Sequence, residues 1–177
     1  MLFWHLGGTT AIIRYAFRDE RMDLRFLMVG AVLADVLDTP VGLAFWATLR
    51  NVRLFGHSLA FAAAVMVVVL LTTRRGRPRK RWMPLAVGVL IHLVLDAMWR
   101  QPETLWWPFL GWEFTERAYA TAGDYVSAIL GDWRTWAFEA VGLGYLVYLV
   151  RRARLSDPAR RHEFYRTGRI DVPIGRP

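Results

Sequence analysis

Long apolar stretches alternate with short basic segments along the chain, and this pattern predicts its architecture. Residues 54–73 carry no charged side chain. Their length matches the roughly 20 residues that a helix needs to cross the hydrocarbon core of a bilayer. Residues 26–49 and 82–99 are apolar apart from a few Asp and His residues, and residues 135–150 form a shorter apolar stretch. The pattern predicts an all-α, polytopic membrane bundle of about four to five helices.

A proline predicts an interruption in one of these helices. Pro40 lies inside the apolar stretch 26–49, shortly after Asp38. Proline lacks the backbone N–H, and its ring crowds the carbonyl group four residues earlier. We therefore expect this helix to be broken near Pro40. A broken helix at membrane depth is tolerated only where it lines a cavity or is covered by protein.

The distribution of arginine and lysine predicts how the bundle is oriented. Six of the 23 basic residues lie in residues 74–81, and eight more lie in residues 151–177. Cytoplasmic segments of membrane proteins carry an excess of Lys and Arg. We therefore expect a multi-pass protein of the cell (inner) membrane, with the 74–81 loop in the cytoplasm. Residues 1–150 would form the membrane-embedded domain, and residues 151–177 a basic cytoplasmic tail.

Charge and composition narrow the chemistry. The net charge is +8, but the basic residues are concentrated in the expected cytoplasmic loop and tail. We expect these segments to contact anionic membrane lipids, not nucleic acid. The chain contains no cysteine, which excludes disulfides, thiolate metal sites and a cysteine nucleophile. The sequence does not indicate an oligomeric state.

Several ionisable side chains lie in or beside the segments expected to span the membrane, where a charge costs free energy. Each charged group inside a membrane span costs roughly 2.5–3.5 kcal/mol on insertion scales and is therefore a functional candidate. Three of the four histidines lie in or beside the apolar stretches, together with several acidic residues. These residues are His5, Asp35, Asp38, His57, His92, Asp96 and Glu139. We expect Glu139 to pair with an arginine or to support a ligand.

Spacing and orientation bring the other six residues together. His92 and Asp96 are four residues apart, and Asp35 and Asp38 are three apart, so each pair shares one helix face. With the loop of residues 74–81 in the cytoplasm, all six residues lie in the outer half of the membrane. The orientation rests on arginine and lysine counts alone. The convergence is therefore independent support for a shared site.

Imidazoles and carboxylates without thiolates are typical ligands of Zn²⁺, with Mn²⁺ as the alternative. We therefore expect a divalent metal ion bound by this group of residues. The expected ligands are His5, Asp35, Asp38, His57, His92 and Asp96. Whichever of Asp35 and Asp38 is not used in metal binding could act as the catalytic general base. Asp96 could equally orient a histidine ligand.

Two arginines flank the expected site at the membrane interface. Arg53 precedes the stretch 54–73, and Arg100 follows the stretch 82–99. Guanidinium groups bind phosphate bidentately, which makes both candidates for substrate binding. Interfacial arginines also serve simply as membrane anchors. The depth of the site favours a substrate carried by the membrane, such as a phospholipid or another lipid-linked phosphoester. A water-soluble substrate that enters from outside is the alternative.

The sequence thus predicts a membrane-embedded, metal-dependent hydrolase acting on a phosphoester or lipid-linked substrate from the outer side. A small transporter or channel, moving protons or metal ions through the same His and Asp residues, is the alternative. The chain shows no internal repeat, which disfavours a transporter because many are built from repeated halves. A metal-stabilised scaffold without turnover is a third interpretation.

The same residues lie in motifs that resemble those of a known family. The motifs are His5 followed by Gly8, the run from Gly30 to Asp38, Gly56-His57-Ser58, His92-Leu93-Val94-Leu95-Asp96 and Trp106-Trp107-Pro108-Phe109. Over roughly residues 1–110 the chain resembles the YdjM-like family of bacterial inner-membrane proteins. This family is described as LexA-regulated and is predicted to comprise metal-dependent hydrolases. The resemblance implies the same activity and a metal cofactor here.

The chain departs from the family pattern at two motifs. The acidic motif of the family is Pro-Asp-x-Asp, whereas here Ala34 precedes the first Asp and two residues separate the pair. The family segment His-Arg-Gly-x-Thr-His-Ser keeps Arg53, His57 and Ser58, and Val52 takes the place of the first His. The resemblance therefore leaves the number of metal ions open.

Overall fold

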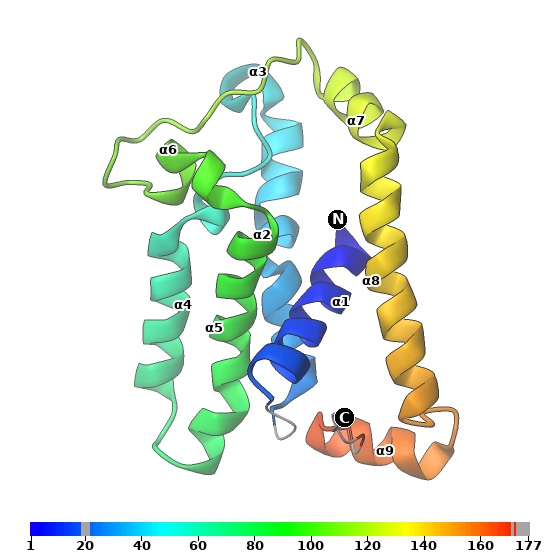
Figure 1. Cartoon of the computed structure of the whole chain (residues 1–177). Helices are drawn as coiled ribbons and strands as arrows, with labels where there is room; N and C mark the ends of the chain where they lie inside the picture. The colour runs from blue at the N-terminus through cyan, green and yellow to red at the C-terminus, as the bar shows by residue number, and fades with distance from the viewer. Residues whose placement is uncertain (19–21, 171, 173–177) are drawn as a thin grey trace.

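The computed structural model describes residues 1–18, 22–170 and 172, and these residues form nine α-helices, three short π or 3-10 helices and no strand (Figure 1). The expected all-α class is confirmed. The number of helices exceeds the expected four to five because the apolar pattern indicated only the long ones. Four of the additional helices are short: α3 (Trp46–Leu49), α6 (Pro102–Leu105), α7 (Ala122–Gly131) and α9 (Pro158–Thr167).

The long helices run roughly along one direction and hold the site between them. They are α1 (Leu2–Ala11, continued by a π-helical turn Ile12–Ala16), α2 (Leu24–Ala44), α4 (Leu59–Thr72), α5 (Arg77–Leu95) and α8 (Trp133–Arg152). Helix α5 packs against both α2 and α4, and α1 packs against α2 and α8. The short helices α3, α6 and α7 lie at one end of the bundle, and α9 lies at the other (Figure 1). Two 3-10 turns, Phe55–His57 and Met98–Arg100, lie before α4 and after α5.

Glycines allow the closest helix contacts. A Cβ atom at Gly30 would clash with the Leu85 carbonyl, and one at Gly88 would clash with the Leu27 carbonyl. The backbones of α2 and α5 can therefore touch, as small residues permit at membrane helix interfaces. Gly7 and Gly142 provide the same close contact between α1 and α8. This packing fixes the relative height of the helices that carry the polar residues.

Helix α2 continues through Pro40 to Ala44, so the expected break near Pro40 is wrong. Pro40 removes only the hydrogen bond that the Val36 carbonyl would accept, and both residues line an open cavity. Beyond the proline, Gly42 packs directly on the backbone of Asn51 and Val52. This contact packs the last turn of the helix against the segment that follows α3.

The lengths and hydropathies of the observed helices confirm only part of the expected set of membrane-spanning helices. Among the described residues, α2 alone is long and apolar enough to span a bilayer, while α4 is apolar but has 14 residues. Helix α4 is shorter than the stretch 54–73 because Phe55–His57 form a 3-10 turn. Helix α5 begins within the basic segment 74–81, which lowers its hydropathy.

The expected C-terminal tail packs onto the helical bundle. Helix α9 follows α8 after a turn, and the side chains of Ile170 and Val172 are buried in a core cluster with Ile13, Leu24 and Leu27. The buried Arg14 guanidinium also donates a hydrogen bond to the Val172 carbonyl. The rest of the expected tail, residues 171 and 173–177, lies outside the described residues.

Candidate metal centre

The Asp38 carboxylate organises the loop that carries His57. Asp38 lies on α2 and is fully buried. Its oxygens accept hydrogen bonds from the backbone N–H groups of Leu54, Gly56 and His57, at 2.8–3.2 Å. A fourth bond, 2.8 Å long, comes from Nδ1 of His57. A Cβ at Gly56 would lie within 3.0 Å of this carboxylate, so the loop can wrap around it only with glycine there.

A main-chain carbonyl fixes the second histidine. His92 lies on α5 and is fully buried, and its Nδ1 atom is 2.7 Å from the Ala31 carbonyl on α2. A carbonyl can only accept, so Nδ1 of His92 must carry the proton. The Asp38 carboxylate, with three backbone donors around it, imposes the same requirement on His57. Both imidazoles, when neutral, therefore present the lone pair of Nε2.

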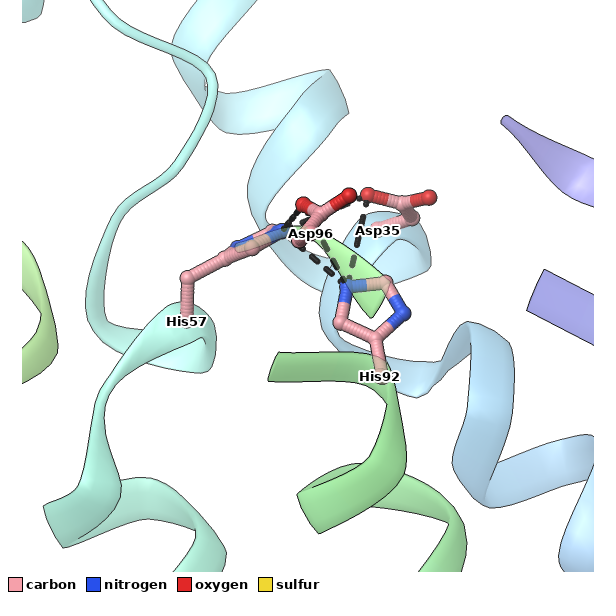
Figure 2. Close-up of side chains that lie close together, drawn as sticks. All are labelled: Asp35, His57, His92 and Asp96. Carbon is pink, nitrogen blue, oxygen red and sulfur yellow. Dashed lines mark hydrogen bonds and ion pairs between the residues drawn. The ribbon is translucent and has the colours of Figure 1, made fainter. Parts of the chain in front are cut away.

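These two lone pairs face each other. The Nε2 atoms of His57 and His92 are 3.2 Å apart. Oδ1 of Asp35 lies 3.4 Å from Nε2 of His57 and 3.8 Å from that of His92. Oδ2 of Asp96 lies at 3.4 Å and 3.9 Å from the same two atoms. Figure 2 shows the four side chains turned toward one point.

The donor set fits a metal ion. One ligand atom from each of Asp35, His57, His92 and Asp96 lies within 4.8 Å of the others. Lone pairs and carboxylate oxygens brought this close repel each other unless a cation or a proton lies among them. Imidazole Nε2 and carboxylate oxygens are the ligands that Zn²⁺ accepts in the absence of cysteine. The hydrogen bonds at both Nδ1 atoms are those that usually orient metal-binding histidines.

The remaining candidate ligand lies beside this group of four. His5 on α1 is fully buried, its ring stacks on that of His92, and its Nε2 atom is 3.1 Å from Oδ1 of Asp96. Its Nδ1 atom contacts the Met1 carbonyl and lies 3.6 Å from Oδ2 of Asp35. The structure thus brings all six predicted residues together, with His5 and Asp38 contacting the group from outside. Glu139 is not part of it, because its carboxylate accepts the backbone N–H of Phe3 at the start of α1.

The two candidate arginines lie in different surroundings. Nε of Arg53 is 2.9 Å from Oδ2 of Asp96, which places this guanidinium at the edge of the cluster. Arg100 is exposed and is not among the residues that line the neighbouring cavity. Helix α5 ends at Leu95, and Ala97 adopts a left-handed backbone conformation that turns the chain before Arg100. The spacing along an ideal helix therefore did not predict the position of Arg100.

A cavity of about 680 Å³ opens beside the cluster. Asp35, Asp96 and Arg53 line it, as do Arg117 and Tyr125 from the segment between α6 and α8. Burial lowers the pKa of Arg117 and the nearby Arg53 lowers it further, whereas burial raises the pKa of Tyr125. Sequence reasoning did not select Arg117. Its one signal was that it is a basic residue within the mainly acidic segment 100–132.

Together these features define a class: a helical protein with an apolar span and a buried His/Asp cluster suited to a metal ion. The model of the YdjM inner membrane protein family matches residues 2–156. The chain therefore belongs to the YdjM inner membrane protein family, as the motifs indicated, and the match extends well beyond them. Comparison with curated proteins and with solved structures gives no match.

Proposed function

We propose that this protein is a membrane-embedded, metal-dependent hydrolase acting on a phosphoester or lipid-linked substrate. The observation that carries the proposal is the pair of Nε2 atoms of His57 and His92, 3.2 Å apart and flanked by two carboxylates. The residues that would hold the metal are Asp35, His57, His92 and Asp96. Zn²⁺ suits this set best, and Mn²⁺ is the alternative.

The carboxylates divide into different roles under this proposal. Asp38 is saturated by four hydrogen bonds and fully buried, so it positions His57 and does not act as the base. His5 similarly holds Asp96 through its Nε2 atom. Asp35 is the carboxylate that can reach a substrate, because its side chain is 28% exposed and lines the cavity. Oδ1 of Asp35 faces His57 and His92, and Oδ2, which lies 3.5 Å from the Met1 ammonium and 3.6 Å from Nδ1 of His5, is the oxygen proposed for proton transfer.

A divalent metal bound here supplies Lewis acidity, polarising an ester oxygen and lowering the pKa of water toward about 7. In phosphoester hydrolysis the oxygen of water bonds to phosphorus, and the bond from phosphorus to the leaving alcohol oxygen breaks. Asp35 accepts the proton that the water gives up. The leaving oxygen takes up a proton from the solvent, and Asp35 then releases its proton to the solvent, so the site returns to its starting state. Arg53 and Arg117 stabilise the negative charge on the phosphoryl oxygens.

The proposed topology is multi-pass. The connection between α4 and α5, which lies in the basic segment 74–81, and helix α9 lie at the same end of the bundle, whereas α7, which lines the cavity, lies at the other end (Figure 1). Cytoplasmic placement of the basic end follows from the excess of Lys and Arg there. The substrate then enters from the outer side, and the basic segments contact anionic lipids of the inner face.

Elemental analysis and hydrolysis of a chromogenic phosphodiester, measured on the same detergent-purified samples, test the proposal. We expect stoichiometric Zn or Mn in the wild type and in His162→Ala, which alters the exposed histidine of α9. His92→Ala should lose both metal and turnover while remaining monodisperse. A wild-type protein without a transition metal would refute the proposal. Proton or metal flux in vesicles without hydrolysis would favour the transporter, and loss of folding in His92→Ala without wild-type turnover would favour a scaffold.

A further inference from the structure

Two arginines from distant segments are held side by side at the cavity. The Gln101 amide oxygen, oriented by the donors around it, accepts hydrogen bonds from Nη1 of Arg53 and Nη2 of Arg117, each 2.8 Å long. Both guanidiniums remain charged at any physiological pH. Two like charges that share one neutral acceptor repel each other. An anion placed between them would relieve this repulsion and would complete the hydrogen bonding of both groups.

Arg117 in particular lacks a counterion in the described part of the chain. Nε of Arg53 pairs with Asp96, but no carboxylate of the described residues lies within 4.0 Å of the Arg117 guanidinium. Its Nε atom contacts the amide oxygen of Asn51 at 3.4 Å. Burial lowers the pKa of Arg117 and the adjacent Arg53 lowers it further, so an anion bound beside Arg117 would favour its charged form. The segment around Arg117 is tied down by the bond from its backbone N–H to the Arg50 carbonyl.

The cavity that these guanidiniums line is otherwise largely apolar. Its volume of about 680 Å³ falls within the range of ligand-binding pockets, roughly 300–1,000 Å³. The aliphatic side chains in its lining come mainly from α2 and α7. Those of α2 and α7 are Val32, Val36, Leu43, Val126, Ile129 and Leu130, and Leu2 and Val52 add to them. A cationic group next to the cluster thus adjoins a hydrocarbon-lined trough, which suits a ligand with an anionic head and an apolar chain.

We propose that the cavity binds a phosphorylated amphiphile, with the phosphate between Arg53 and Arg117 and the hydrocarbon chain against α2 and α7. The inference rests on the proposed hydrolase and names its substrate class. Phosphate matches the site because its oxygens can accept from two guanidiniums at once. Arg53 also contacts Asp96, so a phosphate held by this pair lies next to the candidate metal ligands. A water-soluble phosphoester would use the two arginines but would leave the apolar lining without a partner.

Binding of phosphonates to the full-length protein in neutral detergent tests this inference, because the P–C bond resists hydrolysis. The probes are dodecylphosphonate, methylphosphonate and 1-dodecanol, with complexes counted by native mass spectrometry. We expect dodecylphosphonate to bind at least 100-fold more tightly than either of the others. Each buried methylene group contributes about a factor of four, so octylphosphonate should bind with intermediate affinity. Equal affinity of methylphosphonate would refute the amphiphile in favour of a soluble phosphoester. Equal affinity of dodecanol would refute the anion site.

Variants of the protein distinguish binding of the phosphonate head group from binding of the hydrocarbon chain of the ligand. Arg117→Gln should weaken dodecylphosphonate binding at least tenfold, and Arg117→Lys, which keeps the charge but not the planar fork, should weaken it less. Arg134→Gln is the matched control, because Arg134 is exposed at the start of α8 and does not line the cavity. Ile129→Asn should weaken dodecylphosphonate binding and leave methylphosphonate binding unchanged. Equal effects of Arg117→Gln and Arg134→Gln would overturn the proposal.

The metal content of the same samples distinguishes this inference from the proposed function. Phosphonate binding that depends on Arg117, in a wild-type protein without a transition metal, would refute the hydrolase but leave the anion site intact. Stoichiometric metal and turnover without phosphonate binding would refute the amphiphile and leave the hydrolase intact. Arg53 is unsuitable as the test position because its removal also deprives Asp96 of its ion pair.

Discussion

The Nε2 atoms of His57 and His92 lie 3.2 Å apart although the two residues are separated by 35 positions and lie on different elements. His57 ends a 3-10 turn before α4, whereas His92 lies in the last turn of α5. Each ring is held at Nδ1 by a different acceptor of α2, the Asp38 carboxylate and the Ala31 carbonyl. Helix α2 is therefore the common support that aims both imidazoles at one point.

Asp38→Asn should weaken metal affinity about 10- to 100-fold without reducing the stoichiometry at saturating metal. The amide keeps the volume of the side chain but presents an NH₂ group to donors that need an acceptor, so His57 loses its orientation. Competition with a chelating dye measures the affinity, and elemental analysis measures the stoichiometry. Asp132→Asn is the control, because Asp132 is an exposed cap at the start of α8. Stoichiometric loss of metal in Asp38→Asn would make Asp38 a ligand and contradict this assignment.

Gly88→Ala should destabilise the protein by about 1–3 kcal/mol, because the added methyl group would press on the Leu27 carbonyl of α2. Gly144→Ala is the matched control on α8, since nothing lies within 4 Å of a Cβ at that position. Thermal unfolding in detergent compares the two variants. We expect a lower unfolding temperature and reduced metal content for Gly88→Ala only. Equal unfolding temperatures would show that α2 and α5 are not packed as closely as the structure indicates.

Asn51→Leu should loosen the segment that carries Arg117. Asn51 is fully buried, donates to the Thr115 carbonyl at 2.7 Å and accepts the backbone N–H groups of Val52 and Arg53. Each buried polar group left without a partner costs about 1–3 kcal/mol. We expect lower thermal stability and faster proteolysis next to Arg117. Asn51→Asp keeps the oxygen that accepts from Val52, Arg53 and Nε of Arg117 but turns a second acceptor oxygen toward the Thr115 carbonyl, so an intermediate effect is expected. Equal protease resistance of all three proteins would contradict the prediction.

Labelling of single introduced cysteines tests the proposed topology. The wild-type chain contains no cysteine, so it gives no background labelling. Glu116→Cys should react with a membrane-impermeant maleimide in spheroplasts, since Glu116 is exposed and directly precedes Arg117, which lines the cavity. Arg75→Cys, in the basic loop, should react only after the membrane is opened. The reverse pattern would invert the topology and place the cavity on the cytoplasmic side. Labelling of both cysteines in intact spheroplasts would exclude a membrane crossing by α5, which lies between them, and would contradict the proposed topology.

The sequence predicted which residues meet more reliably than it predicted what each does. Helical spacing placed His92 beside Asp96 and Asp35 beside Asp38, and orientation placed all of them at one depth. Helical spacing could not show that the Asp38 carboxylate is occupied by the loop of residues 54–57, because that loop follows no periodic pattern. Helical spacing also did not predict the position of Arg100, because the left-handed backbone conformation of Ala97 turns the chain after α5.

The hydrophobic pattern by itself determined that the chain is helical and contains an apolar segment long enough to span a membrane. It also showed that His and Asp residues lie within or beside apolar segments, where an ionisable group costs free energy. These properties follow from local composition and from the helical repeat, and the motifs sufficed to indicate the YdjM family. Only the tertiary structure decided that α2 continues through Pro40, that Asp38 supports His57, and that Arg117 joins Arg53 at the cavity. The reason is physical: each of these depends on contacts between segments distant in sequence, whose approach is set by helix packing and buried hydrogen bonds.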